Sequence, residues 1–106
     1  MPKCIAVAVF DGFQILDATG PAQVFASASA MSSKALYDVR IVSATPGPIR
    51  ANGGMTMLAE PLKSVRPHTA LVSGGDEAAI LAAMRDKTLI KWIRSQAKSA
   101  KRLGSV

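Results

Sequence analysis

The first segment of the chain is an unbroken run of six apolar residues, from Ile5 to Phe10. A run without polar interruptions is typical of a strand that is covered on both faces in a parallel sheet. Asp11 and Gly12 then break the run and indicate a loop. The opening of the chain therefore predicts a central, buried strand that leads into a loop.

A helix is expected after this loop, from Pro21 to about Met31. Proline suits the first turn of a helix because its missing N–H has no helical partner there, and Thr19 or Gly20 can cap the helix. Asp17 then lies between the carboxyl end of a central strand and a helix N-terminus, where open α/β sheets gather their ligands. This placement makes Asp17 a candidate site residue.

The remaining pattern alternates strands with helices. The segment at 37–43 alternates in polarity, which suits a strand less buried than the first and nearer an edge. Such alternation predicts one domain over residues 1–106, an α/β three-layer sandwich with a mainly parallel sheet. Beyond the first helix we expect a strand at 37–43, a hairpin of 49–51 and 55–59 around Asn52-Gly53 as an excursion from the main sheet, a helical turn at 62–65, a strand at 69–72, helices at 78–84 and 88–100, and a strand at 101–106.

Two glycines, Gly74 and Gly75, follow the predicted strand at 69–72, and a helix is expected to begin close behind them. Glycines in this position allow backbone N–H groups to point into a site, as binding of an oxyanion or phosphate requires. A pair of glycines is nevertheless a weak motif. On the local sequence alone, an ordinary turn between strand and helix is the favoured interpretation.

Charge is concentrated near the end of the chain, which carries a formal net charge of +6. Seven of the 13 basic residues lie between Arg85 and Arg102, where Asp86 is the one acid. Five of them recur at helical spacing and form a basic stripe: Lys87, Lys91, Arg94, Lys98 and Lys101. An adjacent apolar stripe is expected at Leu89, Ile93, Ala97 and Ala100. The basic stripe could contact nucleic acid phosphates, yet no aromatic or glycine-rich recognition pattern accompanies it. We therefore interpret the stripe as a solvated helix face. The lone Trp92 is expected to pack against the domain or a partner rather than stack on a ligand.

Few residues offer other chemistry. The lone cysteine, Cys4, heads the first apolar strand and is expected to be a core thiol in a reducing compartment, with the cytoplasm as the default location. His68 has no second ligand at metal-binding spacing and is expected to be structural or exposed. No Walker loop, dinucleotide fingerprint or paired CxxC is present, so no cofactor and no metal are expected. The apolar run is too short for a membrane span and does not resemble a signal peptide.

Four stretches, in this order and spacing, resemble a known family: FDGFQILDATGPAQVF, SATPGPIRANGG, LVSGG and KRLGSV. They are similar to the ThiJ/PfpI branch of the class I glutamine amidotransferase-like superfamily, closest to the amidase-like N-terminal domain of AraC-type transcriptional regulators. The resemblance implies a flavodoxin-like fold and a homodimer. In the family, the last strand leads into a nucleophile elbow whose first residue is usually cysteine. Since the chain ends at Val106, one residue short, we expect it to be the N-terminal portion of such a domain.

The resemblance also assigns site residues. Asp17 matches the acidic partner of the elbow cysteine, and Gly74 and Gly75 match the backbone oxyanion site. A carboxylic acid close to a thiolate can share a proton with it. The residues predicted to bind a ligand are Asp11, Gly12, Asp17, Thr19, Gly20, Gly74 and Gly75.

Two functions remain open on this basis. The first is an effector-sensing domain of an AraC-type regulator, which would contact DNA only through a C-terminal domain absent from this chain. The second is an isonitrile hydratase-like or related enzyme that uses Asp17 with a cysteine beyond Val106. The chain as given lacks a nucleophile with a base and is expected to be inert.

Overall fold

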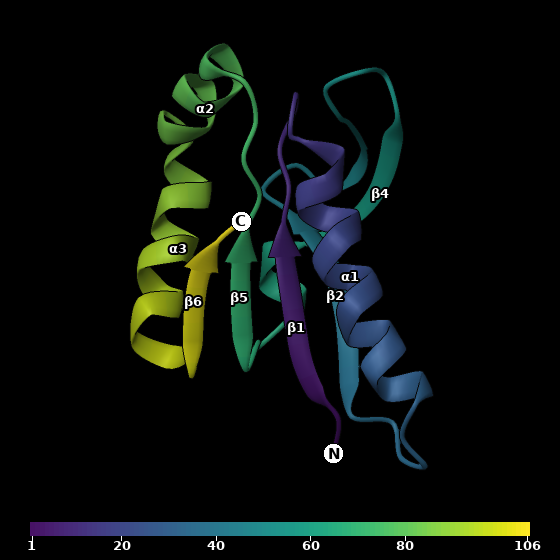
Figure 1. Cartoon of the computed structure of the whole chain (residues 1–106). Coiled ribbons are helices and arrows are strands. Elements are labelled where there is room, and N and C mark those ends of the chain that lie inside the picture. The colour runs from purple at the N-terminus through teal and green to yellow at the C-terminus, as the bar shows by residue number, and fades with distance from the viewer.

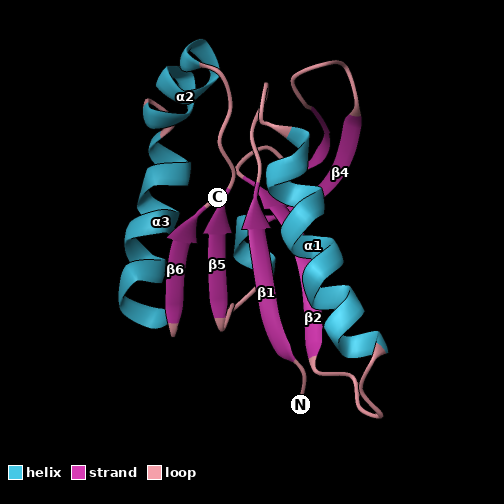
Figure 2. Cartoon of the chain, in the orientation of Figure 1, coloured by secondary structure: helices cyan, strands magenta, loops and turns pink.

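The computed structural model describes residues 1–106 and contains one six-stranded sheet with the strand order β3-β4-β2-β1-β5-β6 (Figures 1 and 2). All neighbouring strands are parallel except β3 and β4, which pair in antiparallel fashion. The elements are β1 (Lys3–Ala8), α1 (Ile15–Ala30), β2 (Tyr37–Ser43), β3 (Gly47–Arg50), β4 (Thr56–Pro61), the 3-10 helix η1 (Leu62–Ser64), β5 (Thr69–Val72), α2 (Glu77–Met84), α3 (Lys87–Ser99) and β6 (Arg102–Ser105).

Two crossovers run in opposite directions from the centre of the sheet. The connection from β1 to β2 passes through α1, whereas the connection from β5 to β6 passes through α2 and α3. Because parallel crossovers are almost always right-handed, opposite directions place their helices on opposite faces. In Figure 1, α1 crosses in front of the sheet and α3 passes behind β6. The predicted three-layer α/β/α sandwich with a mainly parallel sheet is confirmed.

Strand β1 is the centre of the core. Residues Ile5 to Phe10 have at most 8% of their surface exposed, and four of them are fully buried. The strand pairs with β2 on one side and β5 on the other, so that Val7 lies opposite Ile41 and Leu71. The continuous apolar run is therefore explained by helices covering both faces. Strand β2 is less buried than β1, as predicted, but it is not nearer an edge, because β4 and β3 extend the sheet beyond it.

Helix α1 begins at Ile15, six residues before the predicted start at Pro21. The predicted cap is wrong, because the N-cap is Gln14 and its side chain makes no capping hydrogen bond. Thr19 lies inside the helix and its hydroxyl donates to the carbonyl of Ile15 at 3.0 Å. Pro21 also lies inside the helix, where its missing N–H leaves the carbonyl of Asp17 without a helical partner. Contacts of the preceding loop, described below, override the local capping signals.

The hairpin around Asn52-Gly53 is confirmed, with positive φ angles at Gly53 and Gly54. It is not an excursion from the main sheet, since β4 pairs in parallel with the end of β2, where Val42 lies opposite Glu60. The side chain of Arg40 on β2 reinforces this junction, because its Nε donates to Glu60 at 2.6 Å. The hairpin therefore extends the sheet.

Helices α2 and α3 are each capped by an aspartate. Asp76 accepts a hydrogen bond from the N–H of Ala79, and Asp86 accepts from the N–H groups of Thr88 and Leu89. The buried residues of α3 are Leu89, Trp92 and Gln96, so Trp92 packs within the domain as expected. The predicted apolar stripe is wrong at Ala97, which is exposed. The basic residues along α3 are likewise exposed.

None of the helices combines the length and the apolar character that crossing a bilayer requires.

The ion pair between Arg40 and Glu60 predicts a pH-dependent contribution to stability. Hydrogen bonding to Arg40 lowers the pKa of Glu60 below its ordinary value of 4.5, so the stabilisation is present above that pH and is lost as the pH falls through the lowered pKa. Glu60→Gln should lower the urea midpoint at pH 7, and its difference from the parent chain should fade well below pH 4.5. Asp38→Asn, which removes a more exposed contact to Arg40 at 3.3 Å, should have the smaller effect. A difference that persists at low pH would contradict this account.

Candidate functional site

The loop between β1 and α1 is fixed through its backbone to segments on both sides. The N–H of Gly12 donates to the carbonyl of Arg50 at 2.8 Å, and the carbonyl of Phe13 accepts from the N–H of Asn52 at 2.7 Å. The N–H of Gln14 donates to the carbonyl of Gly74 at 2.8 Å. The side chain of Phe13 is fully buried and anchors the loop in the core. Helix α1 therefore starts from a defined position.

This start places the carboxylate of Asp17 beside Gly74. Asp17 lies in the first turn of α1, and its Oδ2 accepts a hydrogen bond from the N–H of Gly74 at 2.7 Å. A Cβ atom at Gly74 would come within 2.9 Å of that oxygen, so only glycine fits without a shift of the carboxylate. The N–H of Gly74, predicted as an oxyanion donor, is thus already paired with an acidic side chain.

Gly75 lies where two backbone segments approach each other closely. A Cβ atom at this position would lie 3.0 Å from the carbonyl oxygen of Gly12 and 3.2 Å from the Cβ of Ala79. Gly12 itself has a φ of +80°, a left-handed conformation that favours glycine. The two glycines therefore allow the loop after β1 and the loop after β5 to pack against each other.

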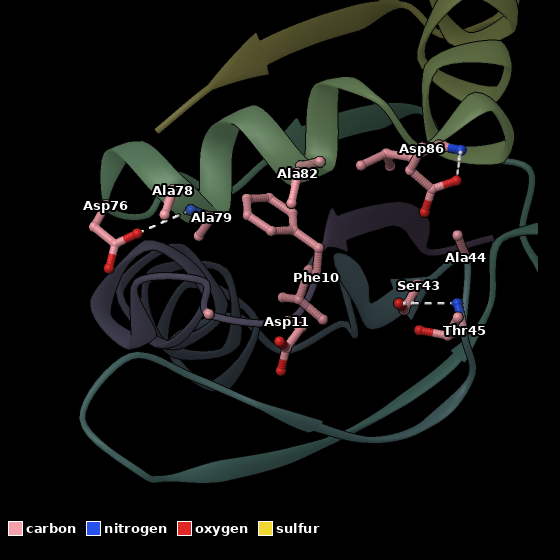
Figure 3. Close-up of a pocket in the computed structure, with 14 residues that line it drawn as sticks. Phe10, Asp11, Ser43, Ala44, Thr45, Asp76, Ala78, Ala79, Ala82 and Asp86 are labelled. Atoms are coloured by element: carbon pink, nitrogen blue, oxygen red, sulfur yellow. Dashed lines mark hydrogen bonds between the residues drawn. The ribbon is translucent and has the colours of Figure 1, made fainter.

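A cavity of about 450 Å³ opens at the carboxyl ends of β1 and β2, next to α2 (Figure 3). Its walls combine the apolar surface of Phe10 and the alanines of α2 with carboxylates and hydroxyl groups. The lining residues are Val9, Phe10, Asp11, Gly12, Ser43, Ala44, Thr45, Asp76, Ala78, Ala79, Ala82, Ala83, Asp86 and Leu89.

The structure separates the predicted site residues into three groups. Asp11 and Gly12 line the cavity, whereas Asp17, Gly74 and Gly75 form the neighbouring contact and do not line it. Thr19 and Gly20 lie in the second turn of α1, and nothing comes within 4 Å of a Cβ built at Gly20. The predicted ligand-binding set is therefore not one cluster.

Four polar residues of the cavity were not predicted from the sequence as site residues: Ser43, Thr45, Asp76 and Asp86. The one signal at the two aspartates is their position shortly before the predicted helices at 78–84 and 88–100. Ser43 and Thr45 lie at the carboxyl end of β2, and the rule that ligands gather there would have indicated them once β2 was known to neighbour β1. The sequence does not reveal which strands are neighbours.

The acceptor oxygens of the cavity are partly free. One oxygen of Asp76 and one of Asp86 cap helices, and the second oxygen of each makes no hydrogen bond within the protein. Ser43 is 2% exposed, and its Oγ accepts one hydrogen bond from the N–H of Thr45 at 3.2 Å. Asp11 is exposed and unpaired. The cavity therefore presents oxygen atoms with unused acceptor capacity.

Cys4 and His68 lie away from this edge of the sheet. Cys4 is half-buried near the start of β1, and burial, followed by the charge of Asp38, raises the pKa of its thiol. His68 precedes β5, and burial, followed by the charge of Lys3, lowers the pKa of its imidazole. No three side chains of the His, Cys, Asp or Glu type are grouped in a way that could hold a metal ion.

The geometry around Gly75 and Gly20 predicts opposite responses to the same substitution. Gly75→Ala should destabilise the chain by about 1–3 kcal/mol, because its methyl group meets backbone that cannot easily move. Gly20→Ala should stabilise it by about 0.5–1 kcal/mol, since the site is open and helical. Urea denaturation measures both. If both substitutions changed the free energy of unfolding by the same amount and with the same sign, the close approach of the loops would not constrain residue 75.

No family model matches the chain. Among curated proteins, it is 39% identical over 77 residues to an uncharacterized protein in the cpoL 5' region of Streptomyces lividans, an alignment that covers 71% of this chain and 53% of that protein. The chain thus spans about half the length of this relative.

Solved structures match nearly the whole chain. A ThiJ/PfpI family protein from Pseudomonas syringae superposes with a TM-score of 0.83 at 22% identity, covering 99% of this chain and 42% of that one. Drosophila melanogaster DJ-1beta superposes with a TM-score of 0.79 at 16% identity, covering 99% of this chain and 55% of that one. An AraC family transcriptional regulator from Pseudomonas putida superposes with a TM-score of 0.80 at 14% identity, covering 98% of this chain and 54% of that one. The chain therefore has the flavodoxin-like fold of these ThiJ/PfpI, DJ-1 and AraC-regulator structures, as its sequence motifs indicated.

Proposed function

We propose that residues 1–106 form the N-terminal portion of a ThiJ/PfpI-like domain that binds a small-molecule effector, as part of an AraC-type transcriptional regulator. The observation that carries this proposal is the cavity at the carboxyl ends of β1 and β2. The fold shared with the regulator from Pseudomonas putida supports the choice of protein class. That the chain covers about half of each matching structure supports its being one portion of the domain.

The cavity has the properties of a small-molecule site. Its volume of about 450 Å³ falls within the range of about 300–1,000 Å³ that is usual for ligand pockets. It lies where open α/β sheets bind ligands, and it combines apolar walls with a few polar groups that can fix orientation. Asp11 and Gly12, which the sequence predicted as ligand-binding, contribute to it.

The expected partners follow from the same proposal. A regulator of this kind would be cytoplasmic and would act as a homodimer. DNA would be contacted by a domain outside this chain, because the basic residues on α3 are exposed without an accompanying recognition motif.

Filling the cavity tests this proposal. Ala82 is exposed on α2 and lines the cavity, so Ala82→Phe should occupy its space while leaving the fold intact. Leu81→Phe is the matched control, since Leu81 is the preceding exposed residue of α2 and does not line the cavity. In a thermal-shift screen of small metabolites, any compound that stabilises the parent chain should lose its effect on Ala82→Phe and keep it on Leu81→Phe. Stabilisation that survives in both variants would exclude the cavity as the effector site.

An enzyme is the second candidate function, and the position of Asp17 favours it. The N–H of Val106 donates to the carbonyl of Val72 at 3.1 Å, which continues the pairing of β6 with β5. The carbonyl oxygen of Val106 lies 3.8 Å from a Cβ built at Gly74, and Asp17 binds the N–H of that glycine. A cysteine following Val106 would therefore begin close to the carboxylate, as an isonitrile hydratase-like enzyme needs.

Asp17→Asn distinguishes the two functions in the full-length protein. Loss of turnover with an intact fold would support the enzyme, whereas an altered effector response without detectable turnover would support the sensor. Asp38→Asn is the control, because Asp38 is remote from Gly74 and pairs with Arg40. Residues 1–106 alone should show no thiol-dependent activity, since Cys4 is their one thiol and its pKa is raised by burial. Activity that depends on Cys4 would contradict this assignment.

A further inference from the structure

We propose that the cavity beside α2 binds a linear diamine or polyamine, whose ammonium groups pair with the carboxylates along its length. This inference rests on the proposed function, because the cavity is the same one that we assign to the effector. It goes beyond that function by naming the chemical class of the ligand.

The first argument is the distribution of charge. Three of the seven acidic residues of the chain line the cavity, Asp11, Asp76 and Asp86, and none of the 13 basic residues does. The chain as a whole carries a formal charge of +6. The cavity lining is therefore negatively charged although the chain as a whole is positively charged. A negatively charged cavity favours a positively charged ligand.

The second argument is the hydrogen-bonding character of the walls. The polar side chains that line the cavity are carboxylates and the hydroxyl groups of Ser43 and Thr45, and no amide, imidazole, indole, ammonium or guanidinium group is among them. Ionised carboxylates only accept hydrogen bonds. Ser43 is 2% exposed, and its Oγ accepts the N–H of Thr45 and keeps one lone pair without a partner in the protein. The three carboxylates can be satisfied only by N–H or O–H donors, which an alkylammonium group supplies.

The third argument is shape. Asp76 precedes α2 and Asp86 follows it, ten residues along the chain, which corresponds to about 15 Å at the rise of an α-helix. In Figure 3 the two carboxylates lie at opposite ends of α2, and Asp11 lies between them across the cavity. Phe10, Ala79 and the other alanines of α2 supply apolar wall along this path. Separated charges joined by apolar surface match an alkyl chain with amines at intervals.

The helix termini reduce this negative charge without cancelling it. Asp76 and Asp86 cap α2 and α3, and each helix N-terminus carries about half a positive elementary charge. Three carboxylates and two such termini leave a charge of about −2. Arg85 and Lys87 flank Asp86 in sequence but do not line the cavity. A ligand with at least two positive charges is therefore the best electrostatic match.

The test is a titration of the 15N-labelled chain with spermidine, followed by amide chemical shifts. We expect shifts at Asp11, Ser43 and Asp86, and an affinity that rises from putrescine to spermidine as the ligand spans more of the cavity. Asp11→Asn should weaken spermidine binding by at least about fivefold through loss of one charge-assisted contact. Asp11 makes no hydrogen bond that the substitution would disrupt. Glu77→Gln is the matched control, since Glu77 is acidic and adjacent but does not line the cavity.

Three other outcomes would each overturn the inference. Equal weakening by Asp11→Asn and Glu77→Gln, with binding abolished by moderate salt, would indicate non-specific ion pairing. Binding of triethylene glycol at the same amides, without binding of amines, would reject the ligand class and leave the effector cavity in place. If amines shift none of the cavity amides but other metabolites bind there, the ligand class is likewise rejected and the effector cavity remains. If no metabolite of any charge binds at these amides, the proposed function itself fails.

Discussion

The backbone of the loop at residues 11–14 is held on both sides, and the positions of Asp11, Gly12 and Asp17 depend on that constraint. Phe13 buries its side chain completely, and the loop exchanges hydrogen bonds with the turn after β3 and with the loop after β5. An unpaired backbone group at this depth would cost about 1–3 kcal/mol, so these bonds fix the loop in one conformation. The start of α1, and with it the carboxylate of Asp17, follows from this arrangement.

The same constraint divides the carboxyl edge of the sheet into two adjoining regions. Gly12 and Gly75 bring the two loops into backbone contact. On one side Asp17 binds the N–H of Gly74, close to Val106, and on the other side Gly12 contributes to the wall of the cavity. The proposal of an enzyme rests on the first region, and the proposal of an effector site rests on the second.

Basic and acidic residues gather on different parts of the molecule. The basic residues along α3 are exposed and solvated. The aspartates Asp76 and Asp86 stabilise helix N-termini and, because α2 runs along the cavity, also contribute to its negative character. A capping residue that leaves one carboxylate oxygen free can serve both purposes. The cavity thus acquires its charge from residues that the helices need in any case.

The sequence by itself determined the elements and their kind. The apolar run at Ile5 to Phe10, the Asn52-Gly53 hairpin and the division of residues 78–100 into two helices were correctly interpreted, because each depends on burial or on backbone conformations encoded within a few residues. Three features were decided only by the tertiary structure: the early start of α1, the joining of the hairpin to β2, and the cavity. Each depends on which strands are neighbours, and pairing between distant segments is not encoded by local periodicity. Thr19 and Gly20 illustrate this limit, since their local capping signal was overridden by hydrogen bonds between the loop at 12–14 and residues 38 to 60 positions further along the chain.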